Sequence, residues 1–324
     1  MTWLSDENVA RLRNAADLPE PPNDRYDVIE RIASGGMGTV YRVRDLELDR
    51  DVALKVLGSA APSPAERARM LREARVLARL EHPGIVPVHD AGTLADGRVW
   101  YTMRLVRGHR LDEHVRATPD RAGRIRIFER ICESVAFAHA NGVIHRDLKP
   151  SNVMIGAFGE VLVMDWGIAK VRERDGAGPA AAGAPAAAMP AGESGDTRAG
   201  SVLGTPGYMA PEQAQGRSDL VDERADIYAL GAVLRFLLDD GRPVPRRLSA
   251  IVSRAIASDP AQRYARVEAL AEDVSRYLSG AQVAAHRESL AERIARVASR
   301  HRTAIFLVVA YVVMRLAFLV FAPA

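Results

Sequence analysis

Val143-Ile144-His145-Arg146-Asp147-Leu148-Lys149-Pro150-Ser151-Asn152 is the stretch on which the interpretation of the whole chain depends. It places a carboxylate at Asp147 and an amide at Asn152, five residues later. With this spacing a carboxylate can lie beside a reacting hydroxyl while the amide oxygen reaches a metal ion on phosphate groups. Apolar residues at its start and after it, in Val153-Met154-Ile155, predict buried strands that hold the loop rigid.

The composition is that of a globular protein, with 324 residues, 48% hydrophobic and 26% charged. A net charge of +3 is too small and too evenly spread to indicate a nucleic-acid-binding stripe. Cys132 is the only cysteine, which excludes an internal disulfide and a cysteine-based metal site. Among 44 basic residues only Lys55, Lys149 and Lys170 are lysines, and two of them, Lys55 and Lys149, stand where phosphate chemistry would use a compact ammonium group.

Residues 26–57 predict three strands that contain two phosphate-related motifs. The first is Ala33-Ser34-Gly35-Gly36-Met37-Gly38-Thr39-Val40-Tyr41, where glycines let backbone N–H groups approach phosphate oxygens. The second is Val52-Ala53-Leu54-Lys55, whose lysine would point at the phosphates. A helix with the apolar spacing of an amphipathic element is predicted over 64–80 and contains Glu73.

Further motifs follow the opening stretch in order. Asp165-Trp166-Gly167 comes directly after a buried strand, thirteen residues beyond Asn152. Gly204-Thr205-Pro206-Gly207-Tyr208-Met209 leads into Ala210-Pro211-Glu212, and a long apolar helix over 222–239 contains Asp226.

From about Tyr26 to Gly280 these motifs resemble, in order and spacing, those of bacterial eukaryotic-like (Hanks-type) serine/threonine protein kinases. The resemblance implies an α+β, protein-kinase-like two-lobe fold with a β-rich N-lobe at 25–105 and a helical C-lobe at 106–280. Residues 1–24 are expected to be a flexible leader.

The resemblance also implies the site and its ligands, ATP and Mg²⁺. Lys55, held by Glu73, would position the phosphates, while Asn152 and Asp165 would hold the metal. Asp147 would orient and deprotonate a protein Ser or Thr hydroxyl, and Lys149 would steady the γ-phosphate. The nucleotide would be held by Ile32, Ser34, Gly35, Gly36, Met37, Gly38, Val40, Ala53, Lys55, Met103, Arg104, Val106 and Met154.

Two departures from the family pattern leave a rival interpretation open. Ala33 stands in place of the first glycine, and the chain between Arg242 and Leu248 is several dozen residues shorter than in comparable kinases. A third departure, Trp166 in place of phenylalanine, keeps a large aromatic side chain and is read as tolerated. A pseudokinase acting as a binding module is one rival, although the polar set that catalysis needs is complete. A small-molecule kinase of similar fold is the other, with DLKPSN and GTPGYMAPE favouring protein substrates.

The segment 176–200 consists of Ala, Gly and Pro at 19 of 25 positions and predicts a disordered insert in the activation segment. Ser194, Thr197 and Ser201 lie near its end. We expect autophosphorylation at one of them to order the segment through Arg146, by analogy with kinases in which such an arginine binds a phosphate.

The C-terminal part is expected to attach the chain to the cell membrane. Residues 281–302 predict a basic juxtamembrane helix, and 303–323 predict a transmembrane helix whose single charge is Arg315. The arginines before the span place the kinase domain in the cytoplasm as a single-pass protein. The expected partners are protein substrates, ATP and membrane, with no nucleic acid; a homodimer is left open.

Overall fold

The fold was analysed in a computed structural model. The structure describes residues 18–35, 38–58, 62–117, 120–166, 170–171, 205, 207–217, 221–289, 292–293 and 302–321. For some residues in helices and strands, Glu73 among them, it describes the backbone and not the side chain.

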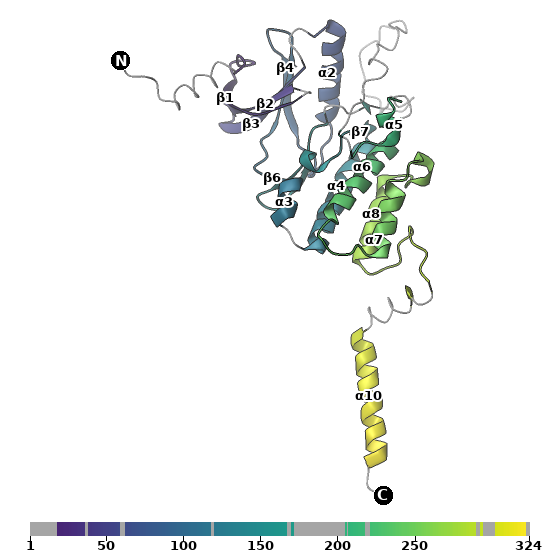
Figure 1. Ribbon diagram of the computed structural model, residues 1–324. Helices are drawn as coiled ribbons and strands as arrows, with labels where there is room; N and C mark the ends of the chain where they lie inside the picture. Colours follow the sequence, from purple (N-terminus) through teal and green to yellow (C-terminus); the bar gives the residue numbers. More distant parts are fainter. Residues whose placement is uncertain are drawn as a thin grey trace, which may run out of the picture.

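The N-lobe is a five-stranded antiparallel sheet in the order β1-β2-β3-β5-β4 (Figure 1). Its strands are β1 Tyr26–Gly35, β2 Gly38–Asp45, β3 Arg50–Leu57, β4 Val88–Thr93 and β5 Val99–Arg104. The three strands expected over 26–57 are present, and so is the hairpin that turns at Asp96-Gly97, where Gly97 has a φ of +86°. Gly38 is required by contact, because a Cβ there would lie 2.1 Å from the Val56 carbonyl oxygen.

Helix α2, Pro64–Leu77, forms within the range 64–80 where the apolar spacing predicted a helix, and it contacts β4 and β5. Its Ala74 packs with Leu57, Val99 and Tyr101 in one of two small N-lobe cores. The other core contains Tyr26, whose hydroxyl donates to Asp90 at 3.2 Å. These cores fix β3 and β5, which carry the residues expected to face the nucleotide.

The C-lobe consists mainly of helices, with short strand pairs at its upper edge (Figure 1). Strands β6, β8 and β9 form one sheet, and β7 pairs with β10. The elements are β6 Gly108–Arg110, α3 Leu111–Ala117, α4 Arg121–Ala140, β7 Val143–Ile144, η1 Pro150–Asn152, β8 Val153–Gly156, β9 Val161–Val163, β10 Lys170–Val171, α5 Pro211–Ala214, α6 Glu223–Leu237, α7 Arg246–Ala255, η2 Pro260–Gln262 and α8 Val267–Leu278.

Helices α4, α6, α7 and α8 pack around the main hydrophobic core, which also includes Leu77 of the N-lobe helix and Trp166. Asp120 caps α4 by accepting hydrogen bonds from the N–H groups of Ala122 and Gly123. At the other end the helix terminates before Gly142, whose φ is +76°, and the chain continues into β7. The two-lobe fold expected from the sequence is therefore present.

The C-terminal part differs from the expectation in one respect. Residues 281–289, placed in a basic helix by the sequence analysis, are not helical. They are fixed on the C-lobe instead, because the N–H groups of Ala284 and Ala285 donate to the buried carboxylate of Asp273 at 2.6 and 2.9 Å. These peptide groups are bound outside the i to i−4 pattern that a helix requires.

Helix α10, Arg302–Phe321, is drawn apart from both lobes in Figure 1. In the part of the chain that the structure describes, no helix combines the length and the apolar character needed to cross a membrane.

Candidate active site

Asp226 of α6 anchors the loop between β7 and β8. Asp226 is fully buried, and its carboxylate accepts hydrogen bonds from the backbone N–H groups of His145 and Arg146, both at 2.8 Å. His139 Nε2 lies 2.7 Å from the same carboxylate. Burial acts to raise the pKa of Asp226, but the hydrogen bond with His139 and the charges around it outweigh burial and leave the pKa below its usual value. A charged anchor therefore holds two consecutive peptide groups of the loop.

Two residues at the site have left-handed backbone conformations, which favour glycine. Arg146 has a φ of +70° and Asp165 a φ of +59°. Such conformations cost about 1–3 kcal/mol each and persist where the surroundings impose them. His145 links the two strained regions, since its ring Nε2 lies 2.8 Å from the Met164 carbonyl and its ring packs on Trp166 with 4.6 Å between centroids.

Asp147 is the centre of a polar cluster. Lys149 Nζ lies 2.8 Å from its Oδ2, and the Thr205 hydroxyl lies 3.2 Å from its Oδ1. Lys149 also donates to the Thr205 hydroxyl at 2.7 Å. Asp147 is only 6% exposed, and these partners hold its carboxylate in one orientation.

Asn152 is oriented by the same loop. Its Nδ2 donates to the Asp147 carbonyl at 2.8 Å and to Asp147 Oδ2 at 3.2 Å, which directs its Oδ1 away from the loop. Its own carbonyl accepts from the Met164 N–H at 2.8 Å, next to Asp165. The donor set of one amide oxygen and one carboxylate suits Mg²⁺, which takes few protein ligands when phosphates supply the others.

Lys55 and Asp165 meet although 110 residues separate them. Lys55 Nζ lies 2.8 Å from Asp165 Oδ1, and the Lys55 side chain is 4% exposed. Burial acts to lower the pKa of Lys55, but Tyr101 and Asp165 beside it raise it above its usual value. Burial acts to raise the pKa of Asp165, but Lys55 outweighs burial and lowers it. Both groups are therefore charged at neutral pH, at the point where the lobes meet.

The expected nucleotide-binding residues lie on strands that face this pair. In the strand registers Val40 of β2 is opposite Lys55, and Ala53 of β3 is opposite Met103 of β5. Ala53 is buried and small, which leaves room above it for a base. The others that the structure describes are Ile32, Ser34 and Gly35 on β1, Gly38 on β2 and Met154 on β8.

The hinge carries an arginine whose side chain points away from the expected adenine position. Arg104 donates to Glu160 of the C-lobe at 3.2 Å, and its N–H donates to the Pro87 carbonyl at 3.2 Å. Of the Arg104 backbone, only the carbonyl therefore remains available to hydrogen-bond an adenine base. The backbone of Val106 is the other expected partner of the base.

A buried ion pair anchors α5, which contacts the catalytic loop. Arg263 forms two parallel hydrogen bonds with Glu212, at 2.7 and 2.8 Å, and its side chain is fully buried. Next to it, Gln213 donates to the Arg146 carbonyl at 2.9 Å, which joins α5 to the loop.

Several predicted residues lie outside what the structure describes. They are Gly36 and Met37, the side chain of Glu73, and the phosphorylation candidates Ser194, Thr197 and Ser201. The pairing of Glu73 with Lys55 and the binding of phosphate by Arg146 therefore stay predictions.

Two residues at the site were not singled out from the sequence. Thr205 contacts both Asp147 and Lys149, and Gln213 holds the Arg146 carbonyl. Thr205 belongs to the motif that leads into Ala210-Pro211-Glu212, so its hydroxyl could have been proposed from the sequence. Nothing in the local sequence distinguishes Gln213.

Comparison with known proteins identifies the family. The protein kinase domain model matches residues 26–307. Serine/threonine-protein kinase PknD from Chlamydia caviae is 35% identical over 298 residues, which cover 79% of this chain and 31% of that protein. The corresponding protein from Protochlamydia amoebophila is 33% identical over 302 residues, which cover 80% of this chain and 30% of that protein. The chain thus spans about a third of the length of these curated relatives.

A solved structure has the same fold. The crystal structure of the Mycobacterium tuberculosis PknI kinase domain superposes with a TM-score of 0.57 at 28% identity, covering 78% of this chain and 96% of that one. This chain belongs to the protein kinase family, and the predicted resemblance to bacterial serine/threonine kinases is confirmed.

Proposed function

We propose that this chain transfers the γ-phosphate of Mg-ATP to serine or threonine hydroxyls of proteins. One observation carries the proposal: Lys55 meets Asp165, while Asp147, Lys149, Asn152 and Thr205 form one hydrogen-bonded cluster. The relatives named as serine/threonine kinases support the same substrate class.

In this proposal Asp147 acts on the acceptor. Its Oδ1 faces the Thr205 hydroxyl, so a substrate hydroxyl entering beside Thr205 lies within reach of the same carboxylate. Asp147 orients that hydroxyl for attack on the γ-phosphorus and takes its proton as the new P–O bond forms and the bond from phosphorus to the β,γ-bridging oxygen breaks, so that ADP leaves. Thr205 and Lys149 hold the carboxylate still during this step, which is the positioning on which phosphoryl transfer depends.

The cations then stabilise the negative charge of the transferring group. Lys149 lies next to Asp147, where the acceptor would bind, and Lys55 would contact the phosphates from the N-lobe side. Asn152 and Asp165 would hold Mg²⁺, which neutralises phosphate charge when bound. Lys55 remains protonated at neutral pH because its pKa is raised.

Radiolabel transfer tests the proposal. The full chain is incubated with γ-labelled ATP, Mg²⁺ and a serine-containing or threonine-containing protein substrate. We expect phosphoserine or phosphothreonine, and its loss in Asp147→Asn and Lys55→Met. Binding of Mg-ATP without transfer would favour the pseudokinase, and label on a small molecule alone would favour the small-molecule kinase.

We also propose that the enzyme phosphorylates its own activation segment. Arg146 lies one residue before Asp147, and Ser194, Thr197 and Ser201 lie in the sequence leading to Thr205. Phosphate on one of them would add negative charge near a cation. Phosphopeptide mapping before and after phosphatase treatment tests this; undiminished kcat/KM of the fully dephosphorylated enzyme would refute it.

We propose further that the C-terminal segment 303–323 attaches the chain to the cell membrane, with the kinase domain in the cytoplasm. Large apolar side chains of α10 are exposed, including Phe306 at 71% and Met314 at 64%. Arg315, the one charge, lies 3.4 Å from the Tyr311 hydroxyl, which reduces the cost of placing it among lipids. The full chain should resist alkaline carbonate extraction, and deletion of 303–324 should release it. A full chain that is already soluble would refute the attachment.

A further inference from the structure

Tyr101 of β5 lies directly beside Lys55 in the N-lobe sheet. The antiparallel register of β3 and β5 pairs these two residues as cross-strand neighbours. Side chains at paired positions leave the sheet on the same face, with Cβ atoms about 4.5–5.5 Å apart. A tyrosine and a lysine paired in this way can bring the hydroxyl and the ammonium group together.

The two small cores of the N-lobe agree with this placement. Trp100, the residue before Tyr101, belongs to the core on one face of the sheet. Tyr101 packs with Leu57 of β3 and Ala74 of α2 in the other core. Lys55 lies two positions before Leu57, and side chains alternate along a strand, so Lys55 shares the face of Tyr101.

A hydrogen bond joins the two side chains. Tyr101 is 4% exposed, and an ammonium group has only donors, so Lys55 donates to the Tyr101 oxygen. Burial raises the pKa of Tyr101 above its usual value, while the charge of Lys55 acts in the opposite direction. Tyr101 is therefore neutral at physiological pH. It supplies an acceptor without placing a second negative charge beside Asp165.

Asp165, the charged partner of Lys55, is also assigned to Mg²⁺ in the proposed function. Its Oδ1 lies 2.8 Å from Lys55 Nζ. A carboxylate that holds a divalent cation attracts an ammonium group less strongly, because the cation neutralises part of its charge. Tyr101 does not depend on the metal in this way, since β5 is an interior strand and the Tyr101 ring is fixed in a core.

We propose that Tyr101 is a positioning residue whose hydroxyl holds the Lys55 ammonium in the orientation that binds the nucleotide phosphates. The inference rests on the proposed kinase function, because that function assigns Lys55 to the phosphates. If Tyr101 served only to fill the core, its ring would matter and its hydroxyl would not. Tyr101→Phe separates these two roles, because it removes the hydroxyl and keeps the ring.

The exchange of ammonium protons with water tests the contact in the nucleotide-free chain. The sequence has only three lysines, Lys55, Lys149 and Lys170. Labelling the full chain in detergent with ¹⁵N-lysine therefore gives three ammonium signals in NMR spectra, and Lys55→Met assigns one of them. In Tyr101→Phe, proton exchange at Lys55 should become about fivefold faster, the factor that corresponds to one ordinary hydrogen bond.

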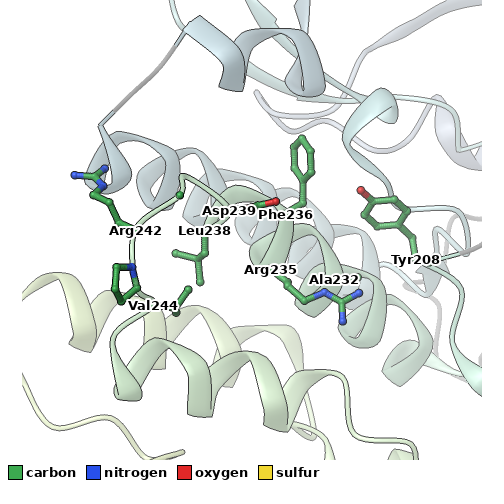
Figure 2. Close-up of a pocket in the computed structure, with 11 residues that line it drawn as sticks. Tyr208, Ala232, Arg235, Phe236, Leu238, Asp239, Arg242 and Val244 are labelled. Atoms are coloured by element: carbon green, nitrogen blue, oxygen red, sulfur yellow. The ribbon is translucent and has the colours of Figure 1, made fainter.

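Two other tyrosine variants are matched controls. Tyr26→Phe removes a hydroxyl in the same lobe that donates to Asp90 at 3.2 Å. Tyr208→Phe makes the same change in the C-lobe, where Tyr208 lines a pocket beside α6 (Figure 2). Both changes lie away from Lys55, so exchange at Lys55 should remain as in the wild type. Circular dichroism checks that each variant is folded.

Calorimetric titration with Mg-ATP separates this inference from the kinase proposal, because it requires no transfer. Tyr101→Phe should bind Mg-ATP about three- to tenfold more weakly than the wild type, whereas Tyr26→Phe should bind it equally well. Exchange at Lys55 that is equally fast in the wild type and in Tyr101→Phe, or unchanged nucleotide binding by Tyr101→Phe, would overturn the inference. If exchange and binding change as expected but the wild type transfers no phosphate, the kinase proposal alone is overturned.

Discussion

Replacing Asp226 by asparagine tests how the fold positions the catalytic loop. In the wild-type chain the two carboxylate oxygens accept hydrogen bonds from the N–H groups of His145 and Arg146, with His139 Nε2 2.7 Å away. Asparagine has nearly the same shape but only one accepting oxygen. One part-buried backbone N–H must then face an amide N–H.

The size of the effect follows from these contacts. An unsatisfied buried donor costs about 1–3 kcal/mol, and the remaining hydrogen bonds lose the extra strength that a charged acceptor supplies, about 1 kcal/mol. The Asp226→Asn variant should therefore be less stable by about 3 kcal/mol, which corresponds to a fall in Tm of about 6–12 °C. Because Arg146 and Asp147 are adjacent, the loop should also shift and kcat should fall at least about tenfold.

Differential scanning calorimetry and steady-state kinetics measure the two effects, with kcat determined well below the unfolding transition. Asp222→Asn is the matched control: it makes the same chemical change on the same helix, where Asp222 caps α6 by accepting from the Arg224 N–H. Asparagine caps helices as well as aspartate does, so both Tm and kcat should remain near wild type. An Asp226→Asn variant with unchanged Tm and kcat would refute the anchoring role of Asp226.

Three further predictions follow from individual contacts. Arg263→Ala should lower the free energy of unfolding by about 3–5 kcal/mol in urea titrations, because it leaves Glu212 buried and unpaired; a loss below about 1 kcal/mol would contradict this. Thr205→Val should reduce kcat on a peptide about 10–100-fold, whereas Thr205→Ser should stay within about threefold; equal losses would show that the hydroxyl is not the active group. The hydrogen bond from Arg25 lowers the pKa of Asp45 from 3.8 to about 2, so the ionised Asp45 stabilises the folded state above about pH 4, and this contribution disappears as the pH falls toward 2. The free energy of unfolding of Asp45→Asn should therefore vary less between about pH 4 and about pH 2 than that of the wild type. Parallel curves of unfolding free energy against pH for the two chains would contradict the prediction.

The sequence predicted the parts of the molecule that local spacing determines. The apolar residues on either side of the loop from Asp147 to Asn152 predicted buried strands that hold it rigid, and β7 and β8 are those strands. The arrangement of apolar residues predicted α2 and α6, because a helix buries one face. The convergence of Lys55 with Asp165 was expected from the family resemblance, since no local pattern relates residues 110 positions apart.

The features that the sequence did not predict depend on contacts between segments that are distant in the sequence. Residues 281–289 have the composition of a basic helix, but Asp273 on α8 binds their peptide groups and holds them in another conformation. Gln213 acquires its role only where α5 meets the catalytic loop.

Isothermal titration calorimetry of the full chain with ATP, in the presence of Mg²⁺ or of EDTA, tests most directly whether the polar residues form a metal–nucleotide site. The account predicts binding by the wild-type chain that weakens at least about tenfold when Mg²⁺ is removed, and a similar weakening in Lys55→Met and Asp165→Asn with Mg²⁺ present. Absence of heat in the wild type, or equal binding by all three chains, would contradict it.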